Sequence, residues 1–292
     1  MNQNIRNFRF KKVECSFTAM CVLRLLFPLV CLACILSIAI QTGAKPAESE
    51  AAPATYLKQT LSLLREQWPT NRTITIVCHG HSVPAGYSKS PLVESFSAYP
   101  HLLHKSIKAR FPCVVINVIV TAIGGENAEE GARRFEQDVL VLRPDVVTID
   151  YALNDRAIGL ARAEAAWNSM ITNAIHRGVK VILLTPTPDL AAKLDDPADP
   201  LNQHADQIRR LARENGVALA DSLVQFQNYV RSGGNLKDLM AQSNHPNGKG
   251  HLLVLPELMK WFPGGSFGRV SASVTQTARA FFARAIFPLR FY

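Results

Sequence analysis

Hydrophobic residues in the middle of the chain form short continuous runs, rich in Val and Ile, which alternate with longer segments of helical spacing. Continuous apolar runs are typical of strands buried on both faces, and apolar positions every three to four residues are typical of amphipathic helices. Strands that alternate with helices pair in parallel, so the pattern predicts a three-layer α/β/α sandwich around a central five-stranded parallel sheet. The expected strands are 73–78, 114–120, 146–150, 179–184 and 217–220, and the expected helices are 99–111, 128–142, 160–177 and 201–215.

The composition divides the chain into four parts. Residues 1–44 combine a basic stretch, an apolar run of about 16 residues and a short segment of small residues, as a signal peptide does. We therefore expect a secreted or periplasmic protein, with an uncleaved membrane anchor as the alternative. The remaining parts are a linker and N-terminal helix at 45–71, one folded domain at 72–265 and a basic extension at 266–292.

The positive charge of the chain is concentrated at its ends. Lys and Arg number 32 against 23 Asp and Glu, a formal net charge of +9. Residues 1–44 hold five basic residues and one acid, and residues 266–292 hold four Arg and no acid, which leaves 23 basic and 22 acidic residues between them. A nucleic-acid-binding domain carries its excess charge on the fold itself. We therefore expect no nucleic-acid partner.

The cysteines give no disulfide framework. Four of the six lie in residues 1–44, which leaves Cys78 and Cys113 for the folded domain. One ends the first predicted strand and the other precedes the second, so they lie at opposite ends of the two strands. We expect both to be buried as small apolar side chains.

Residues that support acyl transfer follow the predicted strands, at the carboxyl edge where ligands bind in parallel sheets. Ser82 follows the first strand, Gly124 and Gly125 the second and Asn154 the third, while His245 precedes a final helix. A serine becomes a nucleophile when a histidine takes its proton, and N–H donors stabilise the resulting oxyanion. Each residue alone is more often structural, as a helix cap or a turn residue.

Together these segments resemble the blocks of the SGNH, or GDSL-type, hydrolases, in family order over residues 72–262. The resemblance implies a flavodoxin-like sheet and a serine esterase. It implies Ser82 as nucleophile and His245 as base, with the Ser82 N–H, Gly125 and Asn154 forming the oxyanion hole. The segments are ITIVCHGHSVPAGY at 74–87, TAIGGENAEEGARRF at 121–135, YALND at 151–155 and NHPNGKGH at 244–251.

Three residues depart from the family pattern. His81 stands where the family usually has Asp, Ala152 replaces a common Gly, and Gln242 replaces the Asp that normally orients the base and stabilises its cation. One interpretation is a Ser–His dyad supported by a carbonyl or an amide. A second is that another carboxylate substitutes, and a third is that the site is a degenerate carbohydrate-binding module. The available acids are Asp238, Asp189 and Asp155.

Three histidines near these segments raise the possibility of a metal site. His79 and His81 lie two residues apart at a strand end, a spacing that points both rings the same way, and His251 follows in the last helix. No acidic or cysteine cluster accompanies them, so we expect no metal and no other cofactor. We expect His251 to pack or to cap within the final helix.

The substrate is the least readable property. Loop 87–97 and the Pro-rich, acidic loop 185–200 are expected to border the cleft, although such a loop is often only a solvated connection. Because no long apolar lid segment is evident, we expect a small-molecule or polysaccharide-linked ester, with carbohydrate deacetylation as the leading hypothesis. The tail 266–292 has apolar residues at helical spacing and suggests peripheral membrane contact, with a loosely packed extension as the alternative.

Overall fold

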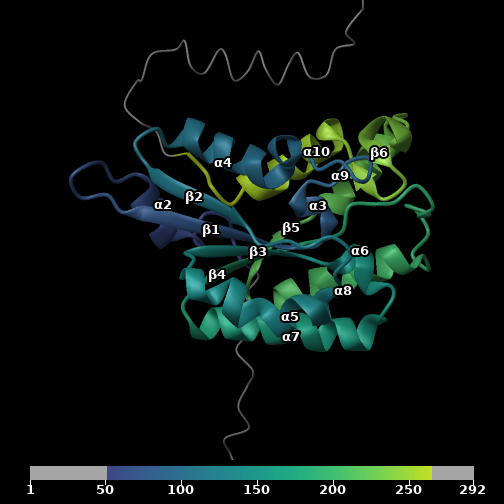
Figure 1. Ribbon diagram of the computed structural model, residues 1–292, viewed down its shortest axis with the longest axis horizontal. Helices are drawn as coiled ribbons and strands as arrows, with labels where there is room; N and C mark the ends of the chain where they lie inside the picture. The colour runs from purple at the N-terminus through teal and green to yellow at the C-terminus, as the bar shows by residue number, and fades with distance from the viewer. Residues whose placement is uncertain (1–50, 265–292) are drawn as a thin grey trace, which may run out of the picture. The chain divides into compact units, whose positions relative to one another are not determined.

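The computed structural model describes residues 51–264 and is built on a five-stranded parallel sheet (Figure 1). The strand order, β2-β1-β3-β4-β5, is that of flavodoxin-like folds. The predicted three-layer sandwich is confirmed, and all five predicted strands are present. They are β1 (Thr73–Gly80), β2 (Val115–Val120), β3 (Val146–Asp150), β4 (Lys180–Leu184) and β5 (Ala218–Ala220).

Helices cover both faces of the sheet, which explains why the strands are apolar at nearly every position. In β1, Ile76 packs into one hydrophobic cluster and Val77 into the other. One layer holds α4 (Tyr99–Arg110), α9 (Ser222–Arg231) and α10 (Gly248–Met259), and the opposite layer holds α5 (Ala128–Asp138), α7 (Leu160–His176) and α8 (Pro200–Glu214) (Figure 1).

Two sequence expectations change at the edges of elements. β2 is an edge strand that pairs only with β1, so Val115 and Val120 are 50% and 44% exposed rather than buried. The helix expected over 128–142 ends at Asp138 and continues as a 3-10 turn, η2 (Leu140–Leu142). That turn stops at Arg143, whose φ of +47° lies in the left-handed region and cannot continue a helix.

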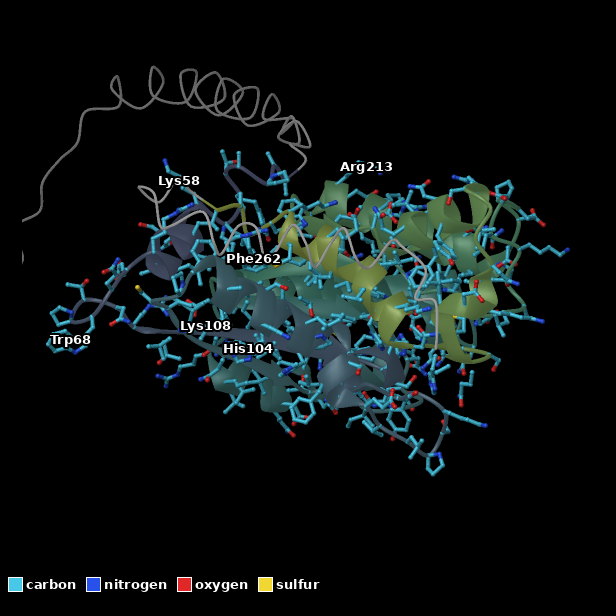
Figure 2. All side chains as sticks on the ribbon, turned by 90° about the horizontal axis from the view of Figure 1, so that it is seen from above. Lys58, Trp68, His104, Lys108, Arg213 and Phe262 are labelled. Atoms are coloured by element: carbon cyan, nitrogen blue, oxygen red, sulfur yellow. The ribbon has the colours of Figure 1, made fainter. Side chains whose placement is uncertain are left out.

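Two side chains near the ends of elements are exposed, contrary to the sequence prediction in the case of Cys113. The N-terminal helix α2 (Lys58–Leu64) buries Leu61 and Leu64, but it ends before Trp68. Trp68 therefore lies in the following turn, is 86% exposed and extends into solvent at one end of the molecule (Figure 2). Cys113 lies in the turn between α4 and β2 and is also exposed, whereas Cys78 is buried as predicted.

The ends of the chain lie outside the described residues. These include the predicted signal or anchor segment 1–44, the first part of the linker and the basic extension 266–292, whose roles stay predictions. Within residues 51–264, no helix has both the length and the apolar character needed to cross a membrane.

Candidate active site

Ser82 and His245 meet at the carboxyl edge of the sheet although 163 residues separate them. Ser82 begins α3 (Ser82–Ala85), a single turn directly after β1, and His245 begins β7 (His245–Pro246), just before α10. The Ser82 Oγ lies 2.9 Å from His245 Nε2, and both residues are buried. At this distance the hydroxyl donates to a neutral imidazole, which is how an adjacent base activates a serine.

The other ring nitrogen of His245 is held by the backbone. Nδ1 donates to the Ser88 carbonyl at 3.0 Å, which leaves the Nε2 lone pair for the Ser82 proton. Burial lowers the pKa of His245; the Ser88 carbonyl raises this pKa to a smaller extent, and nearby His81 lowers it further. The ring therefore stays neutral, and competent as a base, to a lower pH than free histidine.

Gln242 stands directly opposite His245 in the antiparallel pair of β6 (Met240–Gln242) and β7, yet its amide bonds elsewhere. Oε1 accepts the Ser90 N–H at 2.9 Å, and Nε2 donates to Asn244 Oδ1 at 3.0 Å. Gln242 thus braces the backbone close to Ser88, whose carbonyl holds the ring. Its hydrogen bonds do not reach the imidazole.

Across residues 51–264, none of the three alternative acids hydrogen-bonds to His245. Asp189 forms an ion pair with Arg156, and Asp155 accepts the indole N–H of Trp167. Burial raises the pKa of Asp155 to about 6. Asp238 lies in η3 (Leu236–Leu239), the turn before β6. The geometry is that of a serine–histidine dyad supported by a backbone carbonyl.

Two of the predicted oxyanion-hole residues, Gly125 and Asn154, lie on neighbouring segments that hydrogen-bond to each other. Gly125 has a φ of +87°, which glycine adopts without strain, and a Cβ on Gly124 would lie 2.9 Å from the Tyr87 ring. Asn154, in α6 (Ala152–Asp155), donates from Nδ2 to the Glu126 carbonyl at 2.8 Å. An amide nitrogen carries two hydrogens, so one remains for a substrate oxygen.

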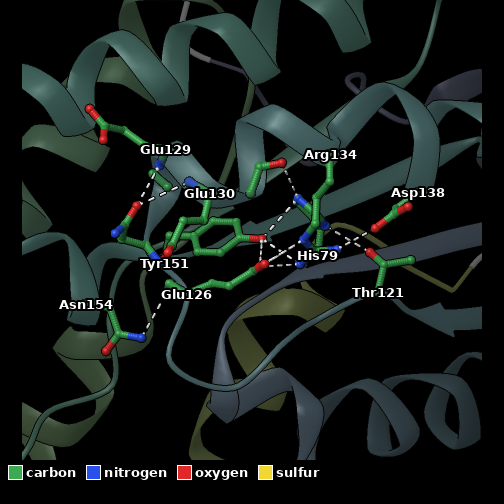
Figure 3. Close-up of polar contacts among 12 residues, drawn as sticks. His79, Thr121, Glu126, Glu129, Glu130, Arg134, Asp138, Tyr151 and Asn154 are labelled. Atoms are coloured by element: carbon green, nitrogen blue, oxygen red, sulfur yellow. Dashed lines mark hydrogen bonds and ion pairs between the residues drawn. The ribbon is translucent and has the colours of Figure 1, made fainter.

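A partly buried polar network fixes Glu126, the residue directly after the glycine pair (Figure 3). Its carboxylate pairs with Arg134 of α5, and Arg134 also donates to the Tyr151 hydroxyl at 3.1 Å. The same hydroxyl lies 3.0 Å from His79 Nε2, and His79 Nδ1 contacts the Thr121 hydroxyl. Burial, together with Arg134, lowers the pKa of His79 to about 3, and burial raises that of Tyr151, so both side chains are neutral.

This network was not predicted from the sequence. In the sequence, Glu126 stands near the start of a predicted helix, where an acid ordinarily only suits the positive end of the dipole. The helix is instead capped by Asn127, whose side chain accepts from the Glu129 and Glu130 N–H groups. The sequence feature that could have indicated the network is Arg134, eight residues after Glu126. A helix that starts at residue 128 brings the Arg134 side chain back to the loop that carries Glu126.

The histidines considered for a metal site have separate surroundings. His79 belongs to the network around Tyr151, whereas His81 lies beside Ser82. His251 accepts the N–H of Tyr99, the first residue of α4, so it caps a neighbouring helix rather than its own; burial lowers its pKa to about 4. Among residues 51–264, no three His, Cys, Asp or Glu side chains are grouped so that they could hold a metal ion.

Both loops predicted to border the site reach it. In loop 87–97, the Tyr87 ring lies 5.8 Å from the His245 ring, between centroids. In loop 185–200, the Leu190 N–H donates to the Ser243 carbonyl at 2.7 Å, two residues before His245. The neighbouring Asp189 pairs with Arg156, two residues after Asn154. Loop 185–200 therefore contacts both the segment of the base and that of the oxyanion asparagine.

A serine at the end of the first strand of a flavodoxin-like sheet, with its histidine supplied just before the last helix, is the arrangement of SGNH-type acylhydrolases. Residues 78–253 match the GDSL-like lipase/acylhydrolase family, and the chain belongs to this family. The resemblance predicted from the four sequence segments is confirmed. The protein is accordingly an acylhydrolase that acts on ester bonds.

Solved structures with the same fold include Axe2, an acetylxylan esterase from Geobacillus stearothermophilus. Axe2 is 20% identical, with a TM-score of 0.58 over 68% of this chain and 97% of that chain. LAE5, an alpha/beta hydrolase enzyme from the metagenome of Lake Arreo, Spain, is 22% identical, with a TM-score of 0.56 over 65% and 94%. At these identities the similarity establishes the fold. No curated protein sequence is significantly similar to this chain.

Proposed function

We propose that the protein is an exported serine esterase that works through an acyl-Ser82 intermediate, with His245 as its base. The observation that carries this proposal is the 2.9 Å contact between Ser82 Oγ and His245 Nε2, with Nδ1 bound to the Ser88 carbonyl. Export rests on the composition of residues 1–44.

In the acylation step, Ser82 Oγ bonds to the carbonyl carbon of the ester while its proton passes to His245 Nε2. The carbonyl oxygen becomes an oxyanion, which the N–H groups of Ser82 and Gly125 and the second Nδ2 hydrogen of Asn154 would stabilise. When this intermediate collapses, the bond to the leaving alcohol breaks, and His245 returns the proton to the alcohol oxygen.

In the deacylation step, a water molecule attacks the acyl carbon as His245 Nε2 takes its proton. A second oxyanion forms at the same donors. Its collapse releases the carboxylic acid, and Ser82 Oγ recovers a proton from His245. The Ser88 carbonyl accepts the Nδ1 hydrogen throughout, so the ring keeps one orientation in both steps.

The site favours a short acyl group. The Tyr87 ring packs closely on the Gly124 backbone and lies 5.8 Å from the His245 ring, so an aromatic ring stands beside the base and the oxyanion loop. The polar Asp189–Arg156 pair borders the same site. Axe2, a fold neighbour that is an acetylxylan esterase, agrees with an acetylated carbohydrate as substrate class.

Turnover of a short-chain aryl ester by the purified protein tests the proposal. We expect activity in the wild type that is lost in both Ser82→Ala and His245→Ala. Acetylated xylo-oligosaccharides should then be better substrates than aryl esters of long acyl chains. Activity that survives in Ser82→Ala would show that Ser82 is not the nucleophile.

A second candidate follows from Gln242, which lacks the charge of the usual family acid. In that case the protein is a carbohydrate-binding module on an esterase fold. A well-folded wild type without turnover above background, but with measurable binding of xylo-oligosaccharides by calorimetry, would establish this alternative.

A further inference from the structure

A second imidazole lies beside the predicted nucleophile. His81 Nδ1 is 3.4 Å from Ser82 Oγ, and the His81 side chain is completely buried. The Val83 N–H donates to the same Nδ1 at 3.3 Å. A ring nitrogen that accepts an N–H carries no proton, so the hydrogen of neutral His81 resides on Nε2.

His81 Nε2 faces a buried carboxylate. Its nearest acidic oxygen is Asp150 Oδ1, at 3.5 Å, and the Asp150 side chain is 2% exposed. Asp150 ends β3 directly beside Gly80 of β1, so the sheet register itself places the carboxylate behind the nucleophile turn. The other oxygen, Oδ2, accepts the Tyr99 hydroxyl at 3.2 Å.

The buried His81–Asp150 pair does not serve packing, because an apolar pair in the same place would be more stable. Within residues 51–264, neither His81 Nε2 nor Asp150 Oδ1 has a partner within full hydrogen-bond geometry. A buried carboxylate with one neutral hydrogen bond costs stability that an apolar side chain in the same place would not. The position of Asp150 therefore calls for a role beyond folding.

We propose that Asp150, placed behind His81, supplies the negative charge that Gln242 does not supply to the His245 imidazolium. The proposal rests on the proposed roles of Ser82 and His245. It makes two of the three departures from the family pattern, His81 and Gln242, a single compensated change. The charge lies on the nucleophile side of the base instead of behind it.

The effect of Asp150 is electrostatic. When the Ser82 proton reaches His245 Nε2, a cation forms in a buried site, where a nearby carboxylate is poorly screened by solvent. No proton needs to move through His81, because its Nδ1 already accepts the Val83 N–H. Asp150 thus acts as a positioning residue, through the potential it creates at His245, whereas His81 lowers the pKa of His245 and opposes that potential.

The other titratable groups around His245 do not supply this charge. His251 lies on α10 and interacts with His245 as a like charge, and burial lowers its pKa to about 4. Asp155, on α6, accepts the Trp167 and Ala128 N–H groups, and burial raises its pKa to about 6.

The test compares Asp150→Asn with the wild type in aryl-acetate turnover across pH. We expect kcat to fall about tenfold with little change in KM, because the charge acts on the cation that forms during the reaction and not on substrate binding. The acidic limb of kcat/KM should move to lower pH, because removing a negative charge disfavours protonated His245. An unchanged limb with unchanged kcat would overturn the proposal.

Two further variants guard against a folding artefact. Asp150→Thr removes the charge with a β-branched residue suited to a strand, and it should give the same pH shift. Tyr99→Phe removes a hydrogen bond to Asp150 but keeps its charge. This variant should leave the acidic limb of the kcat/KM profile at its wild-type pH. A shift in Tyr99→Phe as large as in Asp150→Asn would show that packing, not charge, is responsible.

A double-mutant cycle with Gln242→Asp gives the decisive comparison. Because residue 242 faces His245 across the β6–β7 pair, an Asp there supplies the missing charge from the usual side. Gln242→Asp should restore most of the activity and the pH limb to Asp150→Asn, while changing the wild type little. Equal effects in both backgrounds would overturn the proposal.

The failure of this inference is distinguishable from a failure of the proposed function. If Ser82→Ala is inactive and Asp150→Asn resembles the wild type, only the role of Asp150 is wrong. If Ser82→Ala retains full activity, the proposed nucleophile itself is wrong, and the role of Asp150 that depends on it is wrong as well.

Discussion

Replacing Gln242 by Ala should damage the protein's stability more than its chemistry. The side chain makes two hydrogen bonds, at 2.9 Å to the Ser90 N–H and at 3.0 Å to Asn244 Oδ1. Neither reaches the imidazole, and the amide carries no charge that the variant could lose. The ring itself stays bound to the Ser88 carbonyl, which no side-chain substitution removes.

The expected magnitudes follow from these contacts. Each hydrogen bond is worth about 0.5–1.5 kcal/mol net, and Ser90 is exposed, so we expect a loss of about 1–2 kcal/mol in the free energy of unfolding. For a domain of this size that loss lowers the melting temperature by roughly 2–4 °C per kcal/mol. Turnover should fall by less than about tenfold, against about a thousandfold or more for His245→Ala.

The assay pairs kcat/KM for an aryl acetate with thermal and urea unfolding of each variant. Asn244→Ala is a matched control, because it removes the contact to Gln242 Nε2 but leaves the Ser90 contact in place. It should show about half the stability loss and wild-type turnover. If Gln242→Ala is as inactive as His245→Ala while still folded, the glutamine is an essential orienter of the base, and the carbonyl-supported dyad is refuted.

Three further predictions concern the base and the oxyanion loop. Burial lowers the pKa of His245, so kcat/KM should rise with pH through a value below the 6.5 of free histidine; an acidic limb above that value would contradict the assignment. Glu126→Gln breaks the ion pair with Arg134, so kcat should fall about tenfold and stability by about 2 kcal/mol, measured by turnover and urea unfolding; unchanged kcat would separate the network from the oxyanion loop. Gly131→Ala would bring a Cβ to 2.3 Å from the Tyr151 ring, and we expect a loss of about 1–3 kcal/mol in unfolding; a gain would contradict the tight packing.

The sheet and the meeting of the main site residues could be predicted because each depends on local pattern. Continuous Val- and Ile-rich runs such as β3 are explained by burial on both faces. The carboxyl-edge rule then selects the loops that follow the strands. By that rule the site contains Ser82, Gly125 and Asn154, which follow strands, and it is completed by His245, which precedes the final helix.

The support of the base could not be predicted, because it belongs to the backbone. Every residue type has a backbone carbonyl, so nothing in the sequence marks the carbonyl of Ser88 as the partner of His245. The pairing of His81 with Asp150 depends on the register of β1 with β3, which places Gly80 beside Asp150. Hydrophobic pattern alone identifies strands but does not fix such a register.

The exposure of Trp68 and of Cys113 has a related cause. Trp68 extends the helical spacing of the preceding apolar residues, yet the helix has already ended at Leu64. Cys113 lies two residues before the edge strand β2 and belongs to the turn that precedes it. Periodicity does not reveal where an element stops, and a side chain just beyond the end can face solvent.

The most direct test of the central claim is covalent capture of the nucleophile. The full chain is treated with an organophosphonate that reacts with activated serines, and the adduct is located by peptide mass spectrometry. The account predicts one stoichiometric adduct on Ser82 in the wild type, strongly slowed labelling in His245→Ala and none in Ser82→Ala. An adduct on another serine, or ester turnover that persists in Ser82→Ala, would contradict it.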